Sequence, residues 1–255
     1  MRIITWLLAV FGISVWLLLP PRTSQAAPAN DVGAILDHVD DLYRGSSSHS
    51  TLTMHVVTAH STRDLDIEQW TKGTDKFLMR ILGPEKERGI STLMSGSNIW
   101  NYFPKVDQLT KLSPSMMGAS WMGSHISNNE LVKRSRMRND FIPTKTFEGT
   151  RDGQAVIELT LLPKPDAAVV WGKIVLLIKV SDHNPTKAFY FDEGKKLAQT
   201  VIFSAERPFS GRSLPSSMKF VPADKPNEYT EIRWNVLEFD VNVADDKFSQ
   251  RSLQK

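Results

Sequence analysis

Histidine is the residue in this chain with the greatest capacity for acid–base or metal chemistry, and there are six of them. A helical zinc site needs two histidines four residues apart with a glutamate between them, and no pair in the sequence has that spacing. His55 and His60 fall on one predicted strand at an odd separation, so they point to opposite faces of it. We therefore expect neither a metal site nor a cofactor.

Two other patterns have the residue types of a catalytic or ion-binding site. The run Gly-Ala-Ser-Trp-Met-Gly at 118–123 misses the spacing of a nucleophile elbow by one residue, and no predicted strand-to-helix turn surrounds it. Asp245 and Asp246 could bind a cation, although paired acids in a terminal segment are most often solvated. The sequence has no glycine-rich phosphate loop. We predict no catalytic residue and a protein that is not an enzyme.

Residues 1–26 have the organisation of a signal peptide that is cleaved on export. Arg2 precedes an apolar run at 3–19, and two prolines and Ser24-Gln25-Ala26 follow. The apolar run approaches the roughly 18 residues of a membrane-spanning helix, so an uncleaved anchor is the alternative. The proline break and the small residues favour cleavage after about Ala26. We expect residues 27–255 to form one periplasmic domain, and a chain without cysteine carries no disulfide and no lipid-modified cysteine.

The charge of the mature chain is nearly balanced. The full sequence has 31 basic and 28 acidic residues, and the leader removes Arg2 and Arg22 but no acid, which leaves 29 against 28 and a net charge of +1. A general nucleic-acid binder needs a concentrated basic face. The balance therefore excludes nucleic acid as the expected partner.

Hydrophobic periodicity predicts one helix followed by many strands. Apolar residues recur at three- and four-residue steps from Val32 to Tyr43, between an Asn30-Asp31 cap and Gly45. From Thr51 the period is two, which predicts strands joined by short turns, and hence a strongly curved antiparallel sheet. The predicted strands are 51–60, 63–71, 75–82, 90–95, 98–103, 106–112, 154–162, 169–180, 186–192, 197–204, 216–221 and 228–239.

Side-chain parity gives two of these strands a clean apolar face. Phe77, Met79 and Ile81 share one face of 75–82. On the strand at 173–180, one face carries Ile174, Leu176, Ile178 and Val180. Such faces are compatible with an ordinary sandwich core or with a ligand cavity. On the other face of that strand, Val175 and Leu177 indicate a covering helix or a dimer.

One long segment, 113–140, interrupts the strand pattern. It begins with a methionine-rich, glycine-flanked loop at 113–124, whose flexible thioethers suit irregular apolar shapes, so it is either a lid over a groove or a plug of the sheet. Ser127-Asn128-Asn129-Glu130 is a capping box that opens a second helix. We expect that helix to carry a basic run, which is either solvated or in transient contact with a membrane surface or an acidic partner: Lys133, Arg134, Arg136 and Arg138.

Several of these stretches resemble a known family. They are the strand and turn at 71–80 with Pro84, the segment 89–104 with its Trp100-x-Tyr102-x-Pro104 pattern, the pieces 113–118 and 120–124, and the closing 241–248. Together they resemble the outer-membrane lipoprotein-sorting proteins, the superfamily of LolA-like periplasmic carriers. The pieces within 113–124 look like a branch that is often found beside resistance-nodulation-division exporters.

The resemblance implies a mainly β half-barrel, a single unclosed antiparallel sheet with helices over its concave face. It implies a carrier or chaperone that binds lipid or lipoprotein acyl chains and exchanges them with an inner-membrane exporter or an outer-membrane acceptor. A lipid- or peptide-sensing adaptor of an exporter is the alternative, and a hydrolase is a third. LolA carriers hold their lid shut with an arginine on an early strand. At the corresponding place in this sequence stands Lys72, and Arg80 lies one strand-length further on, so we assign this role to neither residue. The cargo is therefore either a lipoprotein or another lipid.

Parity and lid position together select the expected lining of the cavity. The predicted ligand-binding residues are Phe77, Met79, Ile81, Leu93, Trp100, Tyr102, Met116, Met117, Trp121 and Met122.

Overall fold

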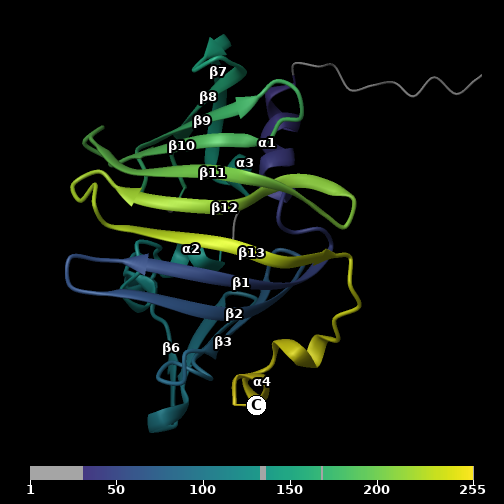
Figure 1. Ribbon diagram of the computed structural model, residues 1–255, viewed down its shortest axis with the longest axis vertical. Coiled ribbons are helices and arrows are strands. Elements are labelled where there is room, and N and C mark those ends of the chain that lie inside the picture. Colours follow the sequence, from purple (N-terminus) through teal and green to yellow (C-terminus); the bar gives the residue numbers. More distant parts are fainter. Residues whose placement is uncertain (1–30, 133–135, 168, 255) are drawn as a thin grey trace, which may run out of the picture. The chain divides into compact units, whose positions relative to one another are not determined.

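Thirteen antiparallel strands form one sheet in the computed structural model of the chain, which describes residues 31–132, 136–167 and 169–254 (Figure 1). Their order is β6-β5-β4-β3-β2-β1-β13-β12-β11-β10-β9-β8-β7. Two meanders, β1 to β6 and β7 to β13, therefore meet where β1 pairs with β13. The described strands do not close into a barrel, since β6 and β7 lie at the two edges. This confirms the predicted fold class.

The strands run as follows: β1 Ser47–Val57, β2 Thr62–Lys72, β3 Lys76–Gly83, β4 Ser91–Ser95, β5 Asn98–Phe103, β6 Gln108–Lys111, β7 Phe141–Arg151, β8 Gln154–Pro163, β9 Lys173–Lys179, β10 Pro185–Phe191, β11 Leu197–Phe209, β12 Arg212–Pro222 and β13 Tyr229–Phe239. The helices are α1 Val32–Asp41, α2 Asn128–Val132, α3 Met137–Asp140 and α4 Gln250–Leu253. Short 3-10 turns lie at Pro104–Val106, Pro114–Met116, Trp121–Gly123 and Asp245–Phe248.

Most predicted elements are present, and the errors have a local cause. The periodic helix from Val32 is α1, and each predicted strand has a counterpart. His60 lies in the turn after β1 rather than on it. Strand β7 was not predicted. It is a sheet edge whose side chains are mostly exposed, so burial does not impose a period of two on its sequence.

Residues Val32–Lys255 form one compact unit, and the predicted leader at 1–26 lies outside the described residues. In the described ranges, no helix combines the length and the apolar character needed to cross a membrane.

The inner face of the sheet carries the main core. We define the inner face as the side of Met54, Phe77 and Leu176, where most cross-strand partners are apolar. Met54 pairs with Leu65 and Ile232, and Leu176 pairs with Leu159. Two buried clusters lie on it, one over β1 to β4 and β13, the other between α1 and strands β7 to β11. Both clusters contact Met218 and Phe220, so the core is continuous across the sheet.

The outer face is covered in one region by the C-terminal segment Val241–Leu253. Its buried side chains Val243, Phe248 and Leu253 pack on the strand residues Leu78, Leu93 and Tyr102. This third cluster explains why strands β3 to β5 are apolar on both faces.

Cations of β2 and β3 fasten this segment to the sheet. Lys72 Nζ donates to the carbonyl of Val243 at 2.9 Å and to Asp245 at 2.7 Å. Lys76 lies 3.1 Å from the same carboxylate, and Arg80 donates to the carbonyl of Ser252. The two lysines also hold the pKa of Asp245 below its usual value. Asp245 therefore holds the C-terminal segment on the sheet through its ion pairs with Lys72 and Lys76.

Phe248→Ala should lower the free energy of unfolding by about 3 kcal/mol, because a buried phenylalanine is removed and the outer cluster is left with a cavity. Val106→Ala is the control, since Val106 is 69% exposed and should change stability by less than about 0.5 kcal/mol. Urea denaturation followed by tryptophan fluorescence measures both. Equal stabilities of the two variants would show that the C-terminal segment is not packed on the sheet.

Candidate functional site

Helix α1 lies over one half of the inner face. Its stripe Ile35, Leu36 and Val39 is buried against the sheet, as the three- and four-residue spacing requires. The chain then turns at Gly45, which has a φ of +66° and lies so close to Asp240 that a Cβ would meet its carboxylate at 3.0 Å. This turn leads directly from the helix into β1.

Tyr43 connects the end of α1 to the sheet. Its ring stacks on Trp234 of β13 with centroids 4.5 Å apart, and its hydroxyl donates to the carbonyl of Pro215 at 2.8 Å. Burial raises the pKa of Tyr43 well above its usual value, so the hydroxyl is a stable donor.

Helix α2 begins with the capping box predicted from its sequence. Ser127 donates from its backbone N and its Oγ to Glu130 Oε2, at 2.9 and 2.7 Å, and Glu130 N donates back to Ser127 Oγ at 3.2 Å. Burial raises the pKa of Glu130, and the hydrogen bonds from Ser127 oppose this rise. The predicted second helix therefore begins where its sequence indicated, but it does not continue through the basic run as one helix. Arg136 has an extended backbone, and Arg138 lies in the separate helix α3.

A cavity of about 550 Å³ lies between the inner face and the helices. Its walls are mainly apolar. The strands contribute Leu52, Phe77, Met79, Met94, Ile174, Leu176, Tyr190, Val201, Phe203, Met218, Phe220, Ile232 and Trp234. The helices and their flanking loops contribute Val39, Leu42, Tyr43, Ile126, Leu131, Val132 and Met137, and Phe141 lines it from the start of β7. The volume lies in the range of small-molecule sites, about 300–1,000 Å³.

A smaller set of polar residues also lines the cavity, including Asp40, Arg44, Glu130 and Tyr190. Burial, with the nearby anions Glu130 and Asp40, raises the pKa of Tyr190, so its hydroxyl stays protonated at neutral pH. Burial also lowers the pKa of Arg44, while Asp40 opposes that shift. An apolar chamber with a few polar groups suits an amphiphilic ligand. Among the described residues, no cluster of three or more metal-ligating side chains is present.

The predicted lining residues fall into four groups. Phe77 and Met79 line the cavity, as predicted. Ile81, Met117, Trp121 and Met122 belong to the same inner cluster but lie outside the cavity lining. Met116 is 41% exposed on the loop.

Leu93, Trp100 and Tyr102 lie on the outer face, which corrects their assignment to the concave side. Leu93 and Trp100 are cross-strand partners and pack, with Tyr102, under the C-terminal segment. The inward positions of β4 and β5 are instead Met94 and Ile99. The apolar side chains of β4 and β5 could not show which face is concave, because both faces of these strands are covered and both are apolar.

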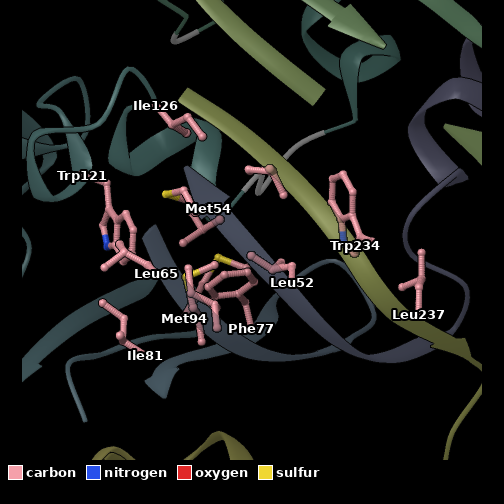
Figure 2. Close-up of a cluster of buried hydrophobic side chains, with 14 of the residues drawn as sticks. Leu52, Met54, Leu65, Phe77, Ile81, Met94, Trp121, Ile126, Trp234 and Leu237 are labelled. Carbon is pink, nitrogen blue, oxygen red and sulfur yellow. The ribbon is translucent and has the colours of Figure 1, made fainter. Parts of the chain in front are cut away.

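Trp121 acts as a plug over β1 to β4 on the inner face. It is 2% exposed, and Figure 2 shows it near Leu65 and Ile81. Its Nε1 donates to Thr92 Oγ1 at 3.1 Å. Arg63 of β2 donates to the carbonyl of Met122, where the backbone has a positive φ of 48°. Of the two roles considered for the methionine-rich loop, this part therefore plugs the sheet, and the following 126–132 roofs the cavity.

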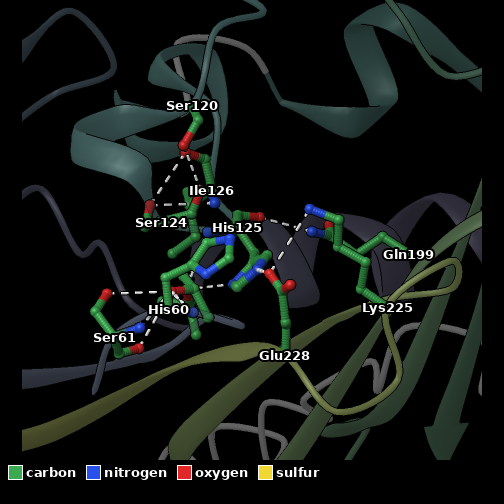
Figure 3. A network of polar contacts seen from close by, with 11 residues as sticks. His60, Ser61, Ser120, Ser124, His125, Ile126, Gln199, Lys225 and Glu228 are labelled. Carbon is green, nitrogen blue, oxygen red and sulfur yellow. Dashed lines mark hydrogen bonds and ion pairs between the residues drawn. The ribbon is translucent and has the colours of Figure 1, made fainter. Parts of the chain in front are cut away.

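His125 anchors the end of this loop to the other meander (Figure 3). Its backbone N and Nδ1 lie 2.9 and 3.0 Å from Thr230 Oγ1 on β13. Its Nε2 lies 3.2 Å from Glu228 Oε2, and Gln199 of β11 donates to its carbonyl at 2.7 Å. The roof of the cavity is thus held by contacts with both halves of the sheet.

Two arginines of the predicted basic run form ion pairs within the protein. Arg136 pairs with Asp41 at 2.8 Å, and Arg138 pairs with Asp37, which ties α3 to α1. Lys133 and Arg134 lie outside the described residues. The two described arginines therefore brace the helices.

Sequence reasoning missed several lining residues. Leu42 and Tyr43 follow α1 directly and belong to the apolar stripe predicted from Val32 to Tyr43, and Ile232 and Trp234 alternate on the predicted strand 228–239. Extending the parity argument to that strand would have found them. Arg63 carries no sequence signal, because its role depends on the conformation of a loop 59 residues away.

Solved structures share this architecture. A DUF1329 family protein from Desulfovibrio piger has a TM-score of 0.78 at 21% identity, over 88% of this chain and 99% of that one. An outer-membrane lipoprotein-sorting protein domain from Vibrio parahaemolyticus has a TM-score of 0.73 at 18% identity, over 89% of this chain and 100% of that one. A LolA superfamily protein from Nitrosomonas europaea has a TM-score of 0.72 at 20% identity, over 87% and 98%.

The fold is therefore that of the LolA superfamily and of the lipoprotein-sorting domains. A family model described as "Uncharacterized protein" matches residues 73–255, well over half of the chain, and the chain belongs to that family. No curated protein matches the sequence.

The bond between His125 and Glu228 gives a pH test of the loop anchor. That hydrogen bond holds the pKa of Glu228 below its usual value of 4.5. A depressed carboxyl pKa contributes stability above the unfolded-state pKa, and the contribution is lost as the pH falls through the folded-state pKa. Glu228→Gln should therefore be less stable than the wild type at about pH 7, and the difference should shrink towards about pH 3.

Urea denaturation at a series of pH values measures this difference. Glu193→Gln, at an exposed position in the turn after β10, is the matched control and should follow the wild type throughout. A Glu228→Gln deficit that stays constant from neutral to acidic pH would contradict the anchor.

Proposed function

We propose that this protein is an exported periplasmic carrier that binds an acyl chain of a lipid or lipoprotein in the cavity under α1 and α2. The observation that carries the proposal is the apolar cavity of about 550 Å³ between the sheet and its helices. An acyl chain gains about 0.8 kcal/mol for each methylene that leaves water, so a cavity of this kind competes with a membrane for it. The likeness to lipoprotein-sorting structures supports the same function.

The arrangement of the site supports carriage rather than catalysis. Polar groups such as Tyr190 and Glu130 lie among apolar walls, where they can orient the polar end of an amphiphile. The size of the cavity supports binding of one chain, or a similarly small part of a lipid, at a time. We propose that a membrane exporter or an outer-membrane acceptor receives or supplies that lipid.

Access to the cavity would require the roof to move. The roof 126–132 is preceded by the anchors at Trp121, Met122 and His125. Each anchor is a small number of hydrogen bonds, so a partner that competes for them would open the cavity.

Filling the cavity tests the proposal. Val201 lines it and is 2% exposed, so Val201→Trp should occupy the space of several methylenes and weaken binding of a fluorescent fatty acid by more than about tenfold. Val236→Trp is the matched control, because Val236 is 44% exposed on the outer face. It should bind like the wild type.

Fluorescence titration gives the two affinities, and thermal unfolding confirms that both variants are folded. Mass spectrometry of an organic extract of the native protein should also find a lipid in stoichiometric amount. Failure of the wild type to bind the fatty acid, together with an empty extract, would refute the carrier and favour an adaptor.

Export is tested separately by the mass of the recovered protein. Protein from the periplasmic fraction should begin at Ala27, the residue after the small-residue cleavage site. A chain that retains Met1 and stays in the membrane fraction would instead establish the uncleaved anchor.

A further inference from the structure

The outer face of β7 to β12 carries a second apolar surface. Cross-strand register aligns one uncharged row over six strands, Thr144, Thr160, Val175, Phe189, Thr200 and Val221. A parallel row is formed by Phe147, Glu158, Leu177, Lys187, Ile202 and Lys219. On the other side lie the pair Ile142 and Leu162 and the run Lys173, Phe191 and Leu197. We call these rows the second outer surface.

This surface is separate from the core. None of its side chains belongs to the three apolar clusters of the described residues. Ile142 and Leu162 are 53% and 52% exposed, and Val175, Phe189 and Phe191 are half-buried. An apolar surface of this extent on a soluble domain is typical of an interaction site.

The charges on the surface are mainly positive. Lys173 lies 3.9 Å from the ring centre of Phe191, and Lys219 lies 3.7 Å from that of Tyr229. Lys187 Nζ is 3.5 Å from a carboxylate oxygen of Asp152, the first residue of the turn between β7 and β8. Glu158 is the carboxylate of the defined rows, and Arg151 pairs with it at 2.9 Å. A partner that brings carboxylates to the lysines would be electrostatically complementary.

The C-terminal segment shows how this sheet receives such a partner. On β3 to β5, apolar side chains of that segment cover an apolar outer region while Asp245 pairs with Lys72 and Lys76. The second outer surface has the same composition, half-buried apolar strands with lysines among them. The chemistry that fits it is therefore an apolar surface edged by acids.

Charge and shape also weigh against two other occupants. In a symmetric pair of this chain, both copies would bring the same excess of positive charge into the interface. A lipid bilayer requires apolar side chains that reach about 5–10 Å into it, whereas Val175 and Phe189 are only half exposed in the middle of strands.

We propose that the second outer surface binds a partner protein that presents an apolar patch edged by carboxylates. The surface lies on the face of the sheet opposite the cavity, so the carrier could hold its ligand and its partner at the same time. This inference does not depend on the cavity containing a lipid.

Site-specific crosslinking tests the proposal in cells that make the protein. The photoreactive residue p-benzoylphenylalanine replaces Leu162 or Ile142, and the controls carry it at Val106 or Val236, exposed apolar positions outside the surface. Illumination should crosslink the two surface variants, and not the controls, to one protein, which mass spectrometry identifies. The purified partner should then bind the wild-type chain with an affinity that falls as salt is added.

The charge requirement is tested on that purified pair. Lys173→Glu with Lys187→Glu should weaken binding by about tenfold or more, and reversal of the contacting acids on the partner should restore it. Thermal unfolding of the double variant should match the wild type, which shows that it is folded whether or not the cavity binds a fatty acid.

Any of four results would overturn the proposal. Two of them are crosslinks to the wrong occupant, either a second copy of the chain or residues 1–30 of the same chain. The third is that no protein is crosslinked and the chain instead floats with phosphatidylglycerol vesicles in a way that depends on the lysines. The fourth is crosslinking no stronger than at Val106 and Val236.

Discussion

The pairing of β1 with β13 is the interaction on which the rest of the structure depends. It joins the first strand of one meander to the last strand of the other, with partners from Ser48 and Phe239 to Val57 and Tyr229. Inward side chains stay paired across this joint on both sides of a register shift between Thr51 and Leu52. The two half-sheets therefore share one apolar inner face. A face of that extent must be covered, and α1, the plug at Trp121 and the roof at 126–132 cover it. The cavity is the space that these covers leave unfilled.

The two faces of the sheet are stabilised in different ways. On the inner face, helices and a loop supply apolar cover while hydrogen bonds from Arg63 and to Thr230 hold the loop. On the outer face, the C-terminal segment is fixed by lysines and by the burial of Phe248. Arg80 and Lys72 were the two residues compared with the lid-holding arginine of LolA carriers. Arg80 holds the C-terminal segment, whereas the arginine that contacts the methionine-rich loop is Arg63.

The sequence was sufficient for the fold class, because alternation and capping are local properties. The helix at Val32 and the capping box at Ser127 are where the pattern requires them. Edge strand β7 escaped prediction because exposed residues need not alternate. Phe77, Met79 and Leu93 were all assigned to the cavity, and Phe77 and Met79 line it. Leu93 lies on the outer face instead, because the distant C-terminal segment covers that face and makes it equally apolar. When both faces of a strand are apolar, the inner face can be identified only once the segments that cover the two faces are known.

Nuclear magnetic resonance of the methionine methyl groups tests the central claim, a ligand within the cavity, most directly. Met79 and Met218 line the cavity, whereas Met116 is 41% exposed on the loop and does not. Addition of a fatty acid should shift the methyl resonances of Met79 and Met218 and give contacts between them and the acyl chain, with Met116 unchanged. Shifts confined to Met116, or no shifts at saturating fatty acid, would contradict the account.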